Sequence, residues 1–198
     1  MEIRQPLPEE SAAVAALVIA SDCGLLDALF GHSVERLVAR LQTRPANPYS
    51  AGHTLVLVES GAAVVGAAVA SVAAAARREE LRTAAALAAW YGPRFLRYLP
   101  RLARAGAATA SLAPDDFYLS HIAVVAERRG AGLGAELLRA AERRARLLGA
   151  HRLVLDVEEA NIGARAFYER MGYEQLSDVT IDLGRHGRFS FHRLFRGL

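Results

Sequence analysis

A strand-like run, a charged turn and a glycine-rich loop follow one another between residues 122 and 134, and an amphipathic helix begins where the loop ends. Gly130, Gly132 and Gly134 occupy alternate positions of the loop. Backbone N–H groups at the N-terminus of a helix are unpaired and lie in a positive field, and glycine lets a ligand approach them closely. The segment therefore predicts an α/β chain with a binding site for a phosphate-bearing cofactor at this loop.

Two cofactors fit the spacing of these glycines. As G-x-G-x-x-A, residues 130–135 form a dinucleotide-binding fingerprint, and Asp156 ends a later strand at about the right distance to hold a ribose hydroxyl. That fingerprint normally follows its strand at once and opens its fold, whereas residues 127–129 intervene here and the loop comes late in the chain. As R-x-x-G-x-G, beginning at Arg129, the loop resembles the pyrophosphate loop of the GNAT superfamily of acyl-CoA N-acyltransferases. The sequence context favours this second interpretation.

A second pattern supports the same resemblance. Residues 161–173 read N-x-x-A-x-x-F-Y-x-x-x-G-Y, which is similar to a second signature of the GNAT superfamily. The resemblance covers nearly the whole chain apart from 73–113 and is most specific over 117–173. Two independent patterns at a family-like separation are a stronger signal than either one alone.

Hydrophobic periodicity and turn residues predict the order of the elements. Strands are expected at 2–5, 53–59, 63–72, 117–125, 151–157, 173–183 and 188–195. Helices are expected at 8–21, 24–30, 33–42, 77–90, 94–104, 132–148 and 161–171. Ser60 and Gly61 are expected to turn the chain between the second and third strands. This order resembles the mixed-sheet α/β fold of GNAT type, so residues 1–198 would form a single acetyltransferase domain with a helical insert at about 73–113, between strands three and four.

The resemblance implies where acetyl-CoA, as the co-substrate, would bind. Family members part strands four and five with a bulge and lay the pantetheine arm in the gap, which here would separate 122–125 from 153–157. Ile122 and Val124 would contact the arm. Backbone groups near Val124 would bond the pantetheine amides and polarise the thioester carbonyl.

The loop residues would hold the other end of the cofactor. The N–H groups from Arg129 through Gly130 and Gly132 to Gly134 would bind the pyrophosphate. The side chain of Arg129 either touches a phosphate or the ribose, or only caps the loop. Asn161, at the start of its helix, either caps that helix or bonds the cofactor arm, and both roles can hold together.

Tyr168 would be the general acid of the reaction. When an amine attacks the thioester, coenzyme A leaves as a thiolate of pKa ~8.5, and a phenol of pKa ~10 can protonate it at modest cost if it is correctly placed. The structural alternative is a core aromatic beside Phe167. Adjacent positions on a helix face about 100° apart, so the two rings are not expected to share one core face, which favours a role for Tyr168.

The general base is less constrained. An alkyl ammonium of pKa ~10.4 must lose a proton before its nitrogen can attack, and His121 has a suitable ordinary pKa, although a single strand histidine is often structural. With unbroken strand alternation, His121 would share a face with Leu119 and Ala123. The other candidates are Tyr118, Ser120, Glu59, Asp115 and Asp116.

Bulk properties limit the remaining function classes. The net charge of +3 is too small to indicate a nucleic-acid partner. The apolar run 11–20 is too short to span a bilayer and follows acidic residues, so neither a membrane span nor a signal peptide is expected. Cys23 is the one cysteine, which excludes an internal disulfide and fits a reducing compartment, so we expect a cytoplasmic protein. No His/Cys spacing suggests a metal site.

The insert carries arginines with aromatic residues between them. Three roles are open for it: an arginine face over an apolar stripe docked on the domain, a lid that binds an acidic or aromatic acceptor, and a surface helix for a membrane or a partner. Homodimer formation through the insert or the final hairpin is open by family analogy.

The resemblance implies an N-acetyltransferase that moves an acetyl group from acetyl-CoA to a primary amine of a small molecule or peptide by direct attack. An acyl-CoA-binding module without catalysis, acting as a sensor or interaction partner, is the alternative from another class. An oxidoreductase using the dinucleotide interpretation is the third. The presence of Tyr168 favours the enzyme, and no motif identifies the acceptor.

Overall fold

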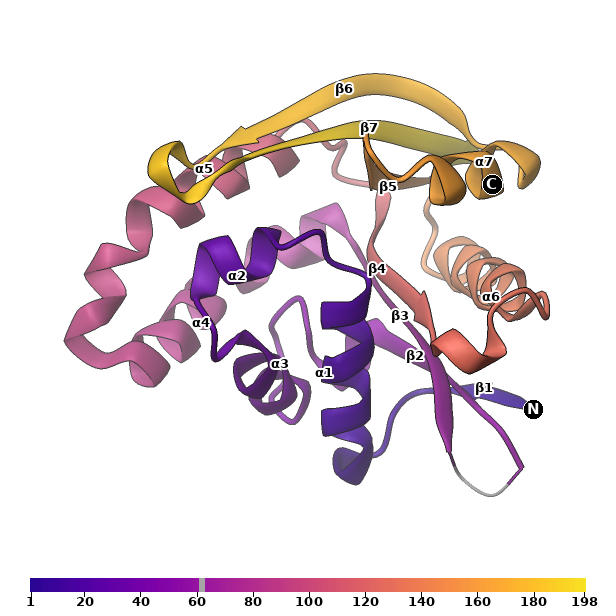
Figure 1. The fold of residues 1–198 in the computed structure, drawn as a ribbon, viewed down its shortest axis with the longest axis horizontal. Helices are drawn as coiled ribbons and strands as arrows, with labels where there is room; N and C mark the ends of the chain where they lie inside the picture. The colour runs from indigo at the N-terminus through magenta and orange to yellow at the C-terminus, as the bar shows by residue number, and fades with distance from the viewer. Residues whose placement is uncertain (61–62) are drawn as a thin grey trace.

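Within residues 1–60 and 63–198, which this computed structural model describes, one mixed sheet has the strand order β1-β2-β3-β4-β5-β7-β6 (Figure 1). The strands are β1 (Glu2–Arg4), β2 (Thr54–Val58), β3 (Val64–Val72), β4 (Phe117–Val124), β5 (Arg152–Glu158), β6 (Glu174–Asp182) and β7 (Arg188–Gly197). All neighbours are antiparallel except β4 and β5, which are parallel. Gly61, the expected turn residue, lies outside the described residues.

Helices cover both faces of this sheet, with α1 and α6 on opposite sides (Figure 1). The helices are α1 (Ser11–Ala20), α2 (Leu25–Phe30), α3 (Val34–Gln42), α4 (Ala73–Tyr91), α5 (Leu99–Thr109), α6 (Leu133–Leu147) and α7 (Ile162–Arg170). Successive side chains of a strand point to opposite faces of the sheet, so the strands contribute to a hydrophobic cluster on each face. Val56 packs in the cluster that includes residues of α1, and its neighbour Leu57 packs in the cluster that includes residues of α6. The expected mixed α/β fold is confirmed.

The second helix of the insert was predicted in the wrong place. It was expected at 94–104, but Gly92–Arg97 is a 3-10 turn and α5 runs from Leu99 to Thr109. Pro100 explains the shift, because proline is tolerated in the first turn of a helix and not in its interior. The first helix of the insert, α4, begins at Ala73, earlier than the expected residue 77.

A bulge in β4 changes the direction of its side chains. Val69 of β3 stands opposite His121 and Ala70 opposite Leu119, so Ser120 is an extra residue between them. Leu119 lies on the α6 side, and Ser120 shifts the alternation so that His121 lies on the α1 side. The expectation that His121 shares a face with Leu119 is therefore wrong, because it assumed an unbroken strand.

Gly66 of β3 lies where a side chain has no room. A Cβ at this position would be 2.8 Å from Leu137 Cδ1 and 3.2 Å from the carbonyl oxygen of Ala123. We expect Gly66→Ala to lower the free energy of unfolding by about 1–3 kcal/mol, because overpacking displaces α6 from the sheet. Urea denaturation measures this. Gly197→Ala is the control, since it also lies in a strand but has open space around its Cβ. Equal effects of the two substitutions would contradict the packing argument.

Candidate active site

A cavity of about 830 Å³ opens where β4 and β5 part. The two strands pair from Phe117 to Leu119, which stands opposite Leu155, and they diverge beyond this point (Figure 1). Because the sheet is open here, elements from both of its faces line the cavity. The sequence-predicted site residues that line it are His121, Ile122, Val124, Arg129, Gly130, Gly132, Gly134, Asn161 and Tyr168.

The backbone of β4 turns part of its hydrogen-bonding edge toward this cavity. The N–H of Val125 donates to the carbonyl oxygen of Val65 at 2.9 Å, which makes this a hydrogen-bonded pair of the antiparallel ladder. Such pairs alternate along the ladder, so the peptide groups of Ile122 and Val124 point away from β3 and into the gap. The carbonyl oxygen of Val124 accepts a bond from Arg129 Nε at 3.2 Å, which is consistent with this direction.

The glycine loop has backbone conformations that other residues adopt only at a cost. Gly130 and Gly132 have φ values of 81° and 82°, in the left-handed region. Gly132 precedes α6 without a side-chain cap, and the first intrahelical bond is donated by Ala135 to Gly132. The N–H groups of Leu133 and Gly134 therefore precede the first hydrogen bond of the helix and have no partner within it. Such N–H groups at the start of a helix can bind an anion.

Asn161 caps α7. Its Oδ1 accepts a hydrogen bond from the N–H of Ala164 at 3.0 Å. The capping role therefore holds. This bond uses Oδ1 alone, so the side-chain amide nitrogen can still donate to a ligand in the cavity.

Tyr168 lies between the core and the cavity, with 7% of its surface exposed. Its ring meets those of Phe167 and Tyr173 edge to face, at centroid distances of 5.2 and 5.7 Å. Burial raises the pKa of the phenol above its ordinary value, so the hydroxyl is protonated at neutral pH but donates its proton less readily than a free phenol does. The expectation that the two rings do not share one core is wrong, since Tyr168 belongs to the cluster that includes residues of α6 and Phe167 packs against it.

The hydrogen bonds around His121 define its tautomer. Ser21 Oγ donates its one proton to the carbonyl oxygen of Val18 at 2.7 Å. His121 Nδ1 lies 3.1 Å from the same Oγ and must therefore be the donor in that contact, which leaves the lone pair on Nε2. Burial lowers the pKa of His121 to about 4. The imidazole is thus neutral at pH 7 and able to accept a proton at Nε2.

Three of the other candidate bases, Glu59, Asp115 and Asp116, are not among the residues that line the cavity. Glu59 pairs with Arg128 at 2.8 Å, and Asp116 is buried against Arg152. Tyr118 and Ser120 do line the cavity. The Tyr118 hydroxyl donates to Asp156 at 2.9 Å, while Ser120 Oγ donates to the carbonyl oxygen of Val69 at 3.1 Å. Within the described part of the chain no donor lies within hydrogen-bond distance of His121 Nε2, so His121 is the candidate whose nitrogen can accept a proton.

Sequence reasoning missed a buried ion pair beside the cavity. Arg193 of β7 is 2% exposed and donates from Nε and Nη2 to the two oxygens of Asp156, at 2.7 and 2.8 Å. It also donates to Ser111 Oγ at 2.6 Å and to the carbonyl oxygen of Ala108 at 3.0 Å. The role of Asp156 in the dinucleotide interpretation is disfavoured, because Arg193 and Tyr118 already donate three hydrogen bonds to its carboxylate. The alternation of polar and apolar residues in β5 and β7 does not indicate that Asp156 and Arg193, which are far apart in sequence, form a pair.

Tyr49 is a second residue that sequence reasoning missed. It lines the cavity, and its ring centroid lies 5.7 Å from that of His121. Burial raises the pKa of its hydroxyl. Tyr49 comes from the loop before β2, which carries no recognisable motif.

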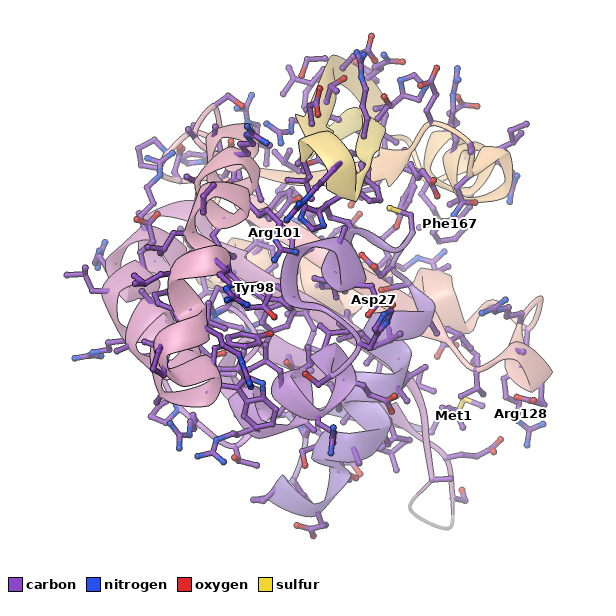
Figure 2. The ribbon with its side chains drawn as sticks, turned by 60° about the vertical axis from the view of Figure 1, so that its left-hand side comes forward. Met1, Asp27, Tyr98, Arg101, Arg128 and Phe167 are labelled. Carbon is purple, nitrogen blue, oxygen red and sulfur yellow. The ribbon has the colours of Figure 1, made fainter. Side chains whose placement is uncertain are left out.

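The insert is docked on the rest of the molecule and forms one wall of the cavity. Tyr91 donates to the carbonyl oxygen of Phe30 and Arg101 to that of Ala28, both at 2.6 Å. Arg101 also lies over the ring of Tyr98, 4.6 Å from its centroid, beside α2 (Figure 2). On the cavity side, α5 presents Ala105, Ala108 and Thr109. Among residues 1–60 and 63–198, no helix combines the length and the apolar character needed to cross a membrane.

Comparisons with known proteins agree with this geometry. The sequence profile of the acetyltransferase (GNAT) family matches residues 26–173. Many solved structures share the fold, and the following three are among them. A crystal structure of an acetyltransferase has a TM-score of 0.68 and 24% identity, with 100% of this chain and 99% of that chain covered. An N-acetyltransferase from Staphylococcus aureus Mu50 has a TM-score of 0.66 and 20% identity, with 99% of this chain and 100% of that chain covered. A ribosomal-protein-alanine N-acetyltransferase from Brucella melitensis has a TM-score of 0.61 and 18% identity, with 100% of both chains covered.

No curated protein matches the sequence. The structural similarities, at these identities, establish the fold, and the profile match over most of the chain establishes the family. The chain belongs to the acetyltransferase (GNAT) family and is an acyl-CoA-dependent acetyltransferase.

Proposed function

We propose that this protein transfers the acetyl group of acetyl-CoA to a primary amine by direct attack. The observation that carries the proposal is the parting of β4 and β5, which brings the peptide groups of β4, the glycine loop and Tyr168 to one cavity. An extended pantetheine arm would complete the edge of β4 in place of the missing β5 partner. The pyrophosphate would bind the amides that begin α6, with Arg129 beside it.

The backbone of β4 would stabilise the negative charge that develops on the thioester oxygen. The N–H groups of Ile122 and Val124 point into the gap and are held rigidly by the pairing of β4 with β3. Fixed donors that face a developing charge in a site shielded from water stabilise it without reorganisation. Asn161 would donate to the cofactor arm from its amide nitrogen.

The proton transfers involve two residues on different faces of the sheet. The bound ammonium first loses one proton to water, because only the neutral amine has the lone pair needed for attack. When the amine nitrogen bonds to the acetyl carbon, it becomes strongly acidic, and Nε2 of His121 accepts its second proton at that stage. When the carbon–sulfur bond breaks, Tyr168 donates its proton to the leaving thiolate. The products are an acetylated amine and coenzyme A.

An acyl-enzyme on the one cysteine is disfavoured. Burial and the neighbouring Asp22 raise the pKa of Cys23 to about 11. Less than one thiol in a thousand is then ionised at pH 7, and the thiolate is the nucleophilic form. Transfer directly from coenzyme A to the amine requires no such intermediate.

Thermal unfolding with and without ligands tests the cofactor. At about 100 times its Kd, acetyl-CoA is expected to add about 2.7 kcal/mol to the free energy of unfolding and to raise the midpoint by a few degrees. NADH at the same concentration is expected to leave it unchanged, since Asp156 is already occupied. A rise with NADH alone would contradict the proposal. Tight acetyl-CoA binding without coenzyme A release in the presence of any primary amine would instead favour the sensor alternative.

A further inference from the structure

The cavity ends on the α1 side of the sheet at the turn between α1 and α2. This end is lined mainly by apolar side chains, among them Leu26, Leu29 and Phe191. Asp22, the second residue after α1, is a charged group in this lining. The glycine loop lies at the other end, where the cavity passes between β4 and β5 toward α6. The cofactor would therefore occupy one end and leave the end near Asp22 to the acceptor.

Hydrogen bonds fix the carboxylate of Asp22 by one of its oxygens. Oδ2 accepts from the N–H groups of Gly24 and Leu26, at 2.8 and 3.0 Å. The left-handed conformation of Gly24, with φ 92°, lets the chain turn around the carboxylate in this way. Both bonds use Oδ2, so Oδ1 remains able to accept a hydrogen bond from an occupant of the cavity.

The charge of Asp22 is not balanced by a basic side chain. Across the part of the chain that the structure describes, no arginine or histidine nitrogen lies within 4.0 Å of this carboxylate. The acids Glu10, Asp116, Glu142 and Asp156 each have an arginine partner, whereas the partly buried Glu158 resembles Asp22 in having none among the described residues. Burial raises the pKa of Asp22, and the carboxylates of Asp27 and of Glu158, which also lines the cavity, contribute in the same direction. A desolvated carboxylate without a counter-charge is costly, and a cation that enters the cavity would relieve this cost.

The arginines of the cavity stand on other elements. Arg128 and Arg129 belong to the glycine-loop segment, and Arg170 ends α7. The cavity is therefore polarised, with positive charge where the phosphates would bind and negative charge at the acceptor end. Among the described residues that line this end, a carboxylate on the acceptor would meet the carboxylates of Asp22 and Glu158 and no arginine.

We propose that Asp22 binds the ammonium group of the acceptor, so that the enzyme selects alkyl amines that carry no carboxylate beside the amino group. An ammonium group offers three N–H donors to the carboxylate and is the form of a primary amine that prevails at neutral pH. The inference rests on the proposed function, because it names the acceptor class of the same site.

The test is the binding of two matched amines to the protein saturated with coenzyme A, measured by calorimetry. The probes are n-butylamine and norvaline, which is n-butylamine with a carboxylate on the amino-bearing carbon. We expect n-butylamine to bind and norvaline to bind at least about tenfold more weakly. Asp22→Asn is expected to weaken n-butylamine binding by about tenfold or more, because it removes the charge and keeps an oxygen for the bonds to Gly24 and Leu26.

Asp27→Asn is the matched control. Asp27 lies on the adjacent α2, but its side chain is 53% exposed and does not line the cavity. This variant is expected to bind n-butylamine as the unmodified protein does, and both variants are expected to keep their affinity for coenzyme A within about twofold, which also shows that they are folded.

The outcomes separate this inference from the proposed function. Equal n-butylamine affinity in Asp22→Asn and the unmodified protein, tighter binding of norvaline, or no binding of n-butylamine would each overturn the assignment of Asp22. Failure of coenzyme A to bind in the first step would overturn the proposed function, and the inference with it.

Discussion

Tyr168→Phe is expected to lower kcat by about 10²–10⁴-fold, which is the usual contribution of a positioned general acid. The substitution removes the proton donor to the leaving thiolate and keeps the ring that packs against Phe167 and Tyr173. Acetyl-CoA affinity and the thermal midpoint are therefore expected to change little. The measurement is the rate of coenzyme A release with the primary amine that gives the highest rate in a panel of alkyl amines.

Tyr173→Phe is the matched control for this substitution. Tyr173 is equally buried, but its hydroxyl donates to Glu142 at 3.0 Å and does not line the cavity. This variant is expected to lose some stability and to keep its kcat. A Tyr168→Phe enzyme with an unchanged kcat would show that another group, or water, protonates the thiolate.

Arg193→Met is expected to lower the free energy of unfolding by about 3–5 kcal/mol, because it leaves the carboxylate of Asp156 buried without a counter-charge. The substitution also removes the bonds to Ser111 and Ala108 that hold α5 beside β7. Urea denaturation, followed by circular dichroism, measures the change. The double variant Arg193→Met/Asp156→Leu is expected to be more stable than Arg193→Met alone, since it removes the unpaired charge as well.

An exposed ion pair provides the comparison. Arg165 and Glu169 pair at 3.1 Å one turn apart on α7, with side chains 45% and 56% exposed. Arg165→Met is expected to change the free energy of unfolding by no more than about 0.5 kcal/mol. If Arg193→Met proved as mild as this, the Arg193–Asp156 pair would not be a stabilising contact of the fold.

The residues proposed to bind the cofactor could be singled out from the sequence because they are close together along the chain, and the structure places them around one cavity. The loop at 130–134 and the helix that follows it form one continuous segment, and their glycine spacing reports the backbone conformation directly. Asn161 and Tyr168 fall in a second continuous segment. Periodicity also placed most helices and strands, since each buries one regular face.

The end of the cavity proposed for the acceptor could not be predicted because it is assembled from distant segments. Asp22 follows α1, Tyr49 comes from a loop, and Arg193 reaches α5 from the last strand. No spacing in the sequence links these residues. The bulge at Ser120 could not be predicted either, because the residues around it are typical of a regular strand. This one extra residue nevertheless moves His121 to the opposite face of the sheet.

The position of α5 has a consequence for how such an enzyme can diverge. The groups proposed for transfer lie on β4, on the glycine loop and on α7, whereas α5 contributes only the small side chains of Ala105, Ala108 and Thr109 to the cavity. This wall is held in place by the hydrogen bonds of Tyr91, Arg101 and Arg193. Larger or smaller residues on that one helix face would shorten or lengthen the space for an acceptor without disturbing the chemistry. The length of the acceptor would thus be set by a helix that carries none of the groups proposed for the transfer.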